Sequence, residues 1–334
     1  MAVIIDAAAL KFPVAHVARD YAQRQIQSVN ATLTRLHDAS DVEALHDFRV
    51  ELRRLRSWIR AYNEFLGVNS KSYKRIGRLA QVTNVARDAE VGLQYLNSIK
   101  KGLQIAEKRG LAWLALELES ASRDGVERAQ KEVTNNWHKI ADQITAQLAS
   151  AGVAAAKTRE TFGEHAAKLL DQHITRLTQR INAVNSDGEF HKVRIAGKRL
   201  RYLVEPLRKD VPQVKQLVQV AKQMQDLLGE LNDAQVLYER LQQSVFAAGK
   251  EQAMKLLAIY TDDKDLDEEK LRVLRHADPV KGLLNLTRLL KNRRDDLVVS
   301  VRQQLPDIMN QITLIADELI AQLIEKELQV AEER

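Results

Sequence analysis

The sequence contains no cysteine, and its 334 residues include only 5 prolines and 13 glycines. The lack of cysteine excludes disulfide bonds, thiolate metal sites and a cysteine nucleophile. Because proline and glycine are the residues that interrupt helices, their scarcity allows long helices. No apolar stretch approaches the roughly 20 residues of a membrane span, and Asp6 interrupts the short apolar opening. We therefore expect neither a membrane span nor a secretory signal.

The composition favours helices over sheets. Hydrophobic residues make up 45% of the chain, charged residues 29% and aromatic residues only 5%. Apolar residues recur at helical spacing, and no alternating strand pattern is present. We therefore predict an all-α fold, with an acidic connection over 261–270 that is exposed to solvent. The predicted helices cover 16–37, 42–66, 70–97, a pair within 102–149, then 160–184, 188–209, 212–247 and further helices to the end.

The second half of the chain repeats the first. A shift of 145 residues places LHDFRVELRRLRSWIRAY (45–62) on the segment that contains FHKVRIAGKRLRY (190–202). His46 then coincides with His191, and Asp88 in RDAEV coincides with Asp233 in NDAQV. Such a repeat indicates an internal duplication. We predict one helical bundle over 1–150 and a second over 151–334.

Each copy of the basic segment has two faces when it is placed on a helix. In the first copy, residues such as Phe48 and Leu52 form an apolar stripe, and the cations follow one line beside it. A solvated helix face usually mixes charges of both signs, because like charges four residues apart repel each other. The second copy repeats both faces, although Glu205 stands where the first has Arg60. A duplicated line of His, Arg and Lys predicts a binding surface for a polyanion.

These paired segments, with RDAEV and NDAQV downstream, resemble the CHAD family, the conserved histidine α-helical domain. The resemblance covers nearly the whole chain. It implies two four-helix bundles related by a pseudo-twofold axis, with a basic groove or pore that binds inorganic polyphosphate. Our predicted polyphosphate-binding residues are His46, Arg49, Arg53, Arg54, Arg56, Lys74, Arg78, His191, Arg194, Lys198, Arg199, Arg201 and Lys222.

The chemistry of these residues agrees with that resemblance. Polyphosphate carries about one negative charge per phosphate, so a row of cations can hold successive phosphates without reading a sequence. The arginine guanidinium makes two charge-assisted hydrogen bonds to one phosphate, and histidine adds a donor whose charge depends on pH near neutrality. Arg54 and Arg199 lie off the main line of each helix.

Two alternatives remain open on the sequence. The first is a metal-dependent polyphosphate or triphosphate hydrolase, in which Asp88 and Asp233 would be paired carboxylates rather than residues that brace helix turns. The second is non-specific nucleic-acid binding, which few aromatic residues near the charge support. We expect a binding protein rather than an enzyme, with no cofactor and no metal. Expected partners are polyphosphate and proteins or granules of polyphosphate metabolism, in the cytoplasm and away from membranes.

Overall fold

The computed structural model describes residues 3–36, 38, 41, 43–155, 159–262 and 268–332. All regular secondary structure in these ranges is helical, which confirms the all-α prediction. Residues 263–267 of the predicted acidic connection, among them Lys264, lie outside the described residues. Within the described part of the chain, no helix combines the length and apolarity that crossing a membrane requires.

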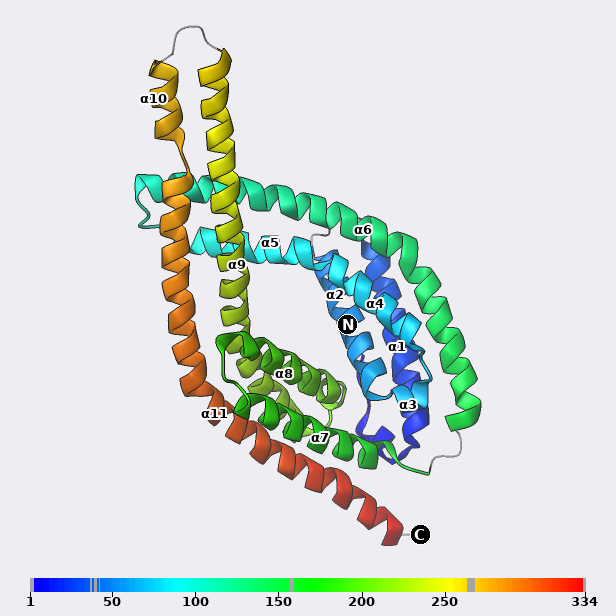
Figure 1. Ribbon diagram of the computed structural model, residues 1–334. Helices are drawn as coiled ribbons and strands as arrows, with labels where there is room; N and C mark the ends of the chain where they lie inside the picture. The colour runs from blue at the N-terminus through cyan, green and yellow to red at the C-terminus, as the bar shows by residue number, and fades with distance from the viewer. Residues whose placement is uncertain are drawn as a thin grey trace. The chain divides into compact units, whose positions relative to one another are not determined.

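The chain contains helices of very different length (Figure 1). Two 51-residue helices and one 53-residue helix alternate with shorter ones. In chain order the elements are η1 (Ala7–Lys11), α1 (Val14–Arg35), α2 (Ala44–Ala61), α3 (Asn63–Leu66), α4 (Ser70–Val82), α5 (Asn84–Ile99), α6 (Ile105–Ala155), α7 (Phe162–Asn182), η2 (Asp187–Glu189), α8 (Phe190–Val204), η3 (Glu205–Leu207), α9 (Pro212–Asp262), α10 (Glu268–Ala277) and α11 (Val280–Glu332).

Several predicted helix boundaries differ from the structure: the helix predicted over 42–66 divides into α2 and α3, and the helix predicted over 212–247 continues as α9 to Asp262. The helix pair predicted within 102–149 is the single helix α6, which contains Gly125 without a break. A Cβ at Gly125 would lie 2.8 Å from the backbone nitrogen of Ala86, so this glycine allows close helix packing. The helix predicted over 70–97 divides into α4 and α5 at Thr83, whose hydroxyl donates to the carbonyl of Ala80 at 2.8 Å. That side-chain bond competes with the regular helical pattern.

The backbone contacts divide the chain into two compact units. Unit 1 comprises Met1–Asn84, Val126–Gly229 and Val301–Arg334, and unit 2 comprises Val85–Gly125 and Glu230–Ser300. Each unit takes segments from both halves of the sequence repeat. The proposed bundles over 1–150 and 151–334, and the pseudo-twofold axis between them, therefore stay predictions.

The core of unit 1 fixes the orientation of α2. Within this unit α1 packs against α2, α7 packs against α8, and α2 also contacts α4 and α8 (Figure 1). Trp58 of α2 is 1% exposed, and its ring lies 4.1 Å from those of both Tyr21 and Tyr62. Its Nε1 donates to the carbonyl of Ala18 at 2.9 Å. Because a buried indole needs a hydrogen-bond partner, this contact sets which face of α2 turns toward the core.

The start of α7 is set by local sequence. Thr161 caps the helix through a hydrogen bond from the backbone nitrogen of Glu164, whose side chain in turn accepts from the backbone of Thr161. This reciprocal capping box satisfies two amide groups that the helix itself leaves unpaired. It fixes the register of α7, whose later turns contribute to the site described below.

Candidate functional site

Helix α2 separates its apolar and cationic residues as the sequence predicts. The apolar stripe is buried, with Phe48, Leu52 and Leu55 all at 0% exposure. Beside it runs a line of partly exposed side chains, which we call the α2 row: His46, Arg49, Arg53 and Arg56. These cations therefore lie outside the core and are not required to fill it.

Helix α8 has the same organisation. Phe190, Val193 and Leu200 are buried, and the neighbouring line carries the second set of cations. We call this line the α8 row: His191, Arg194, Lys198 and Arg201, of which His191 is exposed and the others are partly exposed. The α8 sequence FHKVRIAGKRLRYLV contains no acidic residue, so the helix supplies no carboxylate of its own.

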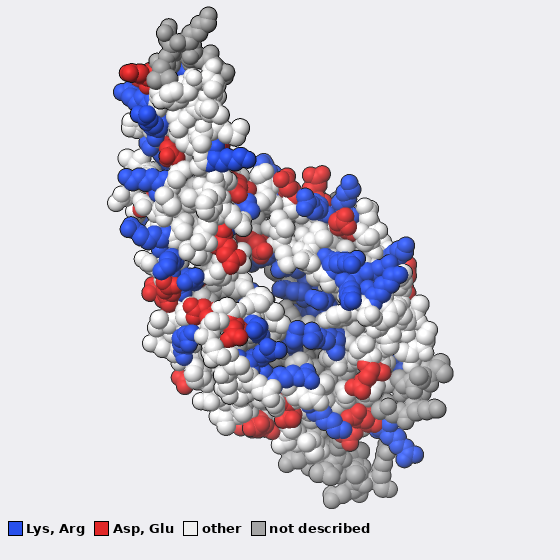
Figure 2. Space-filling view, viewed as in Figure 1, with Lys and Arg blue, Asp and Glu red and all other residues white. Residues whose placement is uncertain are grey.

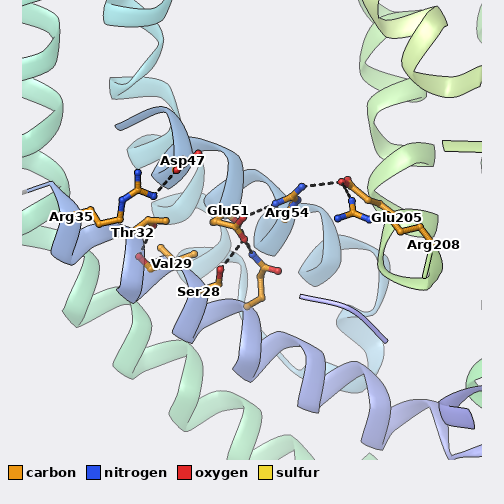
Figure 3. Close-up of polar contacts among 10 residues, drawn as sticks. Ser28, Val29, Thr32, Arg35, Asp47, Glu51, Arg54, Glu205 and Arg208 are labelled. Atoms are coloured by element: carbon orange, nitrogen blue, oxygen red, sulfur yellow. Dashed lines mark hydrogen bonds and ion pairs between the residues drawn. The ribbon is translucent and has the colours of Figure 1, made fainter. Parts of the chain in front are cut away.

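The acidic residues of α2 do not neutralise its row, because both are bound elsewhere. Asp47 accepts from Arg35 of α1 at 2.5 Å. Glu51 is buried and accepts from Arg54 Nη1 at 2.5 Å and from Ser28 Oγ at 3.1 Å. Figure 3 shows both carboxylates turned toward these partners. Among the described residues, no carboxylate lies within ion-pair distance of Arg53 or Arg56.

Helix α4 and the first residue of α5 hold two cations of the α2 row in place. Arg49 Nη1 donates to Asn84 Oδ1 at 2.6 Å, just beyond the end of α4. The guanidinium carbon of Arg56 lies 5.0 Å from the ring centroid of Tyr73, a cation–π contact. A Cβ at Gly77 would lie 3.2 Å from Arg56 Nη2, so this glycine leaves room for the guanidinium. Tyr73, Gly77 and Asn84 were not predicted, because uncharged residues leave no signal in a pattern of charges.

Lys and Arg gather around a hollow over α2, α4 and α8 (Figure 2). The predicted residues Lys74 and Arg78 are exposed on α4, which packs against α2. Lys222 is exposed on α9 in the same unit. All thirteen predicted residues thus belong to unit 1, although they come from four helices.

Arg54 differs from its neighbours because it is neutralised. Its guanidinium bridges Glu51 and Glu205, with 2.9 Å between Nη2 and Glu205 Oε1, and its side chain is 17% exposed (Figure 3). Arg208 also donates to Glu205, at 2.7 Å. Burial acts to lower the pKa of Arg54, but the two carboxylates outweigh burial and raise it. This network joins α2 to η3 and gives Arg54 a structural contact.

Arg199 lies in a different environment, a cavity of about 910 Å³ between α2, α7 and α8. We call this cavity the basic pocket. The titratable side chains that line it with Arg199 are Arg60, Glu64, His173, Arg176, Arg180, Lys192 and Tyr202. The α7 members were not predicted, although His173, Arg176 and Arg180 follow the i, i+3, i+7 spacing of one helix face. His173 is partly buried in this pocket.

The charges of the basic pocket repel each other. Burial lowers the pKa of Arg199, and the nearby positive charge of Arg60 lowers it further. Burial, followed by the charges of Arg176, Arg199 and Arg60, lowers the pKa of His173 to about 4. His173 is therefore uncharged at neutral pH, and its ring offers one donor and one acceptor nitrogen. Such a cluster is stabilised by any anion that enters it.

The carboxylates Asp88 and Asp233 lie in unit 2. Both line a second cavity, of about 160 Å³, together with Glu230, Tyr95 and Arg293. Asp233 accepts from the side chain of Asn232 at 3.3 Å, and both aspartates lie inside helices rather than at an N-cap. Among the described residues, no group of three or more His, Asp or Glu side chains has the arrangement of a metal site.

Fold and site together define an all-helical domain with a cationic, phosphate-compatible surface. The family model for the CHAD domain matches residues 20–242. The chain therefore belongs to the CHAD domain family, which is linked to polyphosphate binding or metabolism.

Two uncharacterized proteins of Mycobacterium tuberculosis, from strains CDC 1551 and H37Rv, are each 25% identical over 275 residues. The match covers 77% of this chain and 50% of each relative, so the chain spans about half of their length.

Two solved structures share the fold. The CHAD domain from the plant Ricinus communis has a TM-score of 0.62 and 18% identity, over 89% of this chain and 94% of that one. PptA from Streptomyces chartreusis has a TM-score of 0.54 and 17% identity, over 85% and 99%.

Proposed function

We propose that this protein binds inorganic polyphosphate through the α2 and α8 rows. The observation that carries the proposal is the contrast within α2 between neutralised and available cations. Arg54 is bound by two carboxylates, whereas Arg53 and Arg56 have none within ion-pair distance among the described residues. Cations that are held outside the core without a counter-charge are favourably placed to meet an external anion.

The spacing of the rows supports a chain-like ligand. Successive row residues are three or four positions apart, so their side chains follow each other along one helix face. A flexible polymer with one charge per phosphate can contact them in turn, and no base recognition is needed. Asn84 and Tyr73 hold Arg49 and Arg56 before any ligand arrives, which reduces the entropy that binding has to overcome.

Binding without hydrolysis is the form of the proposal that these side chains support best. Apart from His46 and His191, the rows consist of arginine and lysine side chains, which hold phosphate but do not activate water. A hydrolase needs a general base or a metal beside the scissile phosphate. The aspartates that were considered for this role, Asp88 and Asp233, line the cavity of unit 2.

A competition assay tests the ligand. Labelled long-chain polyphosphate is bound to the full chain and displaced by unlabelled polyphosphate or by single-stranded DNA of equal total charge. We expect displacement by polyphosphate at concentrations at least tenfold lower than by DNA, because few aromatic side chains near the rows are available to stack bases. Equal displacement would instead assign the surface to nucleic acid.

A parallel incubation tests for catalysis. The protein is kept with polyphosphate and Mg²⁺ or Mn²⁺ for hours, and chain length and free phosphate are measured. We expect both to stay unchanged. Steady phosphate release that is lost in Asp88→Asn or Asp233→Asn would replace the binding proposal with hydrolysis.

Charge reversal locates the site. Arg53→Glu combined with Arg194→Glu removes one cation from each row, and we expect at least a hundredfold weaker binding of long-chain polyphosphate. Neither residue belongs to the buried apolar stripe, so circular dichroism should show unchanged helix content. Lys131→Glu on the exposed face of α6 is the matched control and should change affinity by less than threefold. Loss of helix together with binding would indicate a structural role for the rows.

A further inference from the structure

The basic pocket and the Arg54 network occupy corresponding positions in the sequence repeat. The shift of 145 residues that aligns the two rows also places Arg54 on Arg199 and Arg60 on Glu205. In the first case the structure pairs Arg54 with Glu205 at 2.9 Å. In the second case the partner position holds Arg60, so Arg199 and Arg60 line one cavity as two like charges. The difference between Glu205 and Arg60 therefore replaces an ion pair with a cationic cavity.

We propose that the basic pocket is a separate subsite for a short oligophosphate segment that ends in a dianionic phosphate. The proposal rests on the proposed function, since it names the chemistry that one part of the phosphate-binding surface selects. The ligand group is either the end of a polyphosphate chain or a free oligophosphate such as triphosphate. Both present the same terminal group to Arg60, Arg199 and the α7 side chains.

The pocket holds more positive charge than its own carboxylates balance. Lys192 has a partner in Glu189 at 3.2 Å, and Glu64, the acidic residue of the lining, lies 3.5 Å from His165 Nε2. No carboxylate of the described residues is within ion-pair distance of Arg60, Arg180 or Arg199. These three guanidinium groups come from three different helices, so a bound anion would be contacted from several sides.

The shape and charge density distinguish this subsite from the rows. A row spreads its cations along a helix and suits internal phosphates, each with about one negative charge. The pocket concentrates its cations around one cavity, and a terminal phosphate carries a charge of about −1.5 to −2 at pH 7. Electrostatic attraction is stronger for the group with the higher charge, so the end of a chain is favoured there over its interior.

His173 gives the pocket a readout of its own. It is uncharged in the free protein because burial and the surrounding arginines, Arg176, Arg199 and Arg60, lower its pKa to about 4. Its other pocket neighbours from α2, α3 and α8 that carry charge are Glu64 and Lys192. A phosphate dianion among these groups opposes the arginine charges and raises the pKa of His173. The change is measurable by NMR of the imidazole.

Calorimetry with small phosphates tests the subsite. Linear triphosphate and cyclic trimetaphosphate contain the same number of phosphorus atoms, but the cyclic form has no terminal phosphate. We expect linear triphosphate to bind the full chain at least tenfold more tightly, and to raise the His173 pKa by one unit or more. Equal affinity for the two, or an unmoved His173 signal with bound triphosphate, overturns the proposal.

Arg60→Glu is the decisive variant, because it introduces at position 60 the acidic residue found at position 205. We expect it to pair with Arg199, to keep the fold and to weaken triphosphate binding at least tenfold. Arg180, an exposed residue of α7, provides a second variant: we expect Arg180→Gln to weaken triphosphate binding three- to tenfold. Lys131→Gln on α6, outside the pocket, is the control and should leave triphosphate affinity within twofold. Unchanged affinity in both pocket variants would contradict the assignment.

The two sources of the terminal group are separated with long chains whose ends are free or chemically capped. A fivefold or greater loss on capping identifies the chain end as the ligand, and no loss with retained triphosphate binding identifies a free oligophosphate. This subsite can fail while the rows still bind long chains, which leaves the proposed function intact. Conversely, triphosphate binding without any binding of long chains would contradict the proposed function and keep the subsite.

Discussion

Arg54 and Arg199 are equivalent in the sequence repeat, yet they lie in opposite electrostatic surroundings. Arg54 is 17% exposed and bonded to two carboxylates, whereas Arg199 lines a cavity beside Arg60. The neighbour of each arginine decides whether its charge is neutralised: Glu205 lies beside Arg54, and Arg60 lies beside Arg199. The comparison teaches that a duplicated cationic helix can divide its charges between holding the fold together and meeting a ligand.

The largest expected effect comes from removing the carboxylate that Arg54 and Arg208 share. Glu205→Gln leaves Arg54 and Arg208 without their shared carboxylate, and Glu205 is 8% exposed. Removing one partner of a buried ion pair costs about 3 to 5 kcal/mol when the other charge is left unpaired, and because Arg54 keeps Glu51 the lower end of this range applies. We expect a loss of this size in the free energy of unfolding, measured by urea denaturation.

The matched control for that variant is Glu189→Gln, which removes an acidic residue from a more exposed pair with Lys192. Pairs of this kind contribute about 0 to 1 kcal/mol. If the two variants lose equal stability, the Arg54 network is not a structural element.

A second prediction concerns how His173 in the basic pocket affects the stability of the protein at acid pH. His173 has a pKa of about 4 in the folded chain and about 6.5 when unfolded. Between these values the unfolded state binds more protons, so stability falls as the pH is lowered from 6.5 to 4. We expect His173 to contribute about 2 kcal/mol of this loss, since 1.36 kcal/mol accompanies each pKa unit and the group is only partly buried.

The measurement is urea unfolding at several pH values for the native sequence and for His173→Gln. The variant should show a smaller loss over this pH window. An identical pH dependence in both proteins would mean that the pocket does not depress the pKa of His173.

The smallest expected effect tests how α4 positions the α2 row. Gly77→Ala places a methyl group 3.2 Å from Arg56 Nη2, so the guanidinium has to move away from Tyr73. Alanine is the better helix former by about 1 kcal/mol, and stability should therefore hold or rise. We expect a two- to threefold loss of polyphosphate affinity in a direct binding assay. A gain in affinity would show that Arg56 binds better when it is not held by α4.

Much of the fold and of both rows could be predicted from sequence, because periodicity reports which face of a helix is buried. Phe48 and Leu52 follow the apolar stripe, and Arg53 follows the line beside it. The role of Arg54 could not be predicted in this way, since Glu205 lies 151 residues away in the chain. Its contact depends on how α2 packs against α8, which leads into η3.

The basic pocket was likewise hidden from the sequence. His173, Arg176 and Arg180 share one face of α7, but a helical spacing alone does not say whether that face meets solvent or other cations. Only the packing of α7 against α8 and the contact of α8 with α2 bring them to Arg60 and Arg199. The division into two bundles and the twofold axis also depend on packing between helices, and they stay predictions.

The most direct test compares two adjacent arginines of one helix, Arg53 on the row and Arg54 in the ion-pair network. The affinity for long-chain polyphosphate is measured over a range of salt concentrations for Arg53→Gln, Arg54→Gln and the native sequence. Each phosphate contact contributes about 0.7 to 0.9 to the slope of log affinity against log salt. We predict that Arg53→Gln reduces the slope by one such contact and that Arg54→Gln leaves it unchanged. A slope that falls with Arg54→Gln and not with Arg53→Gln would contradict the division of charges proposed for this surface.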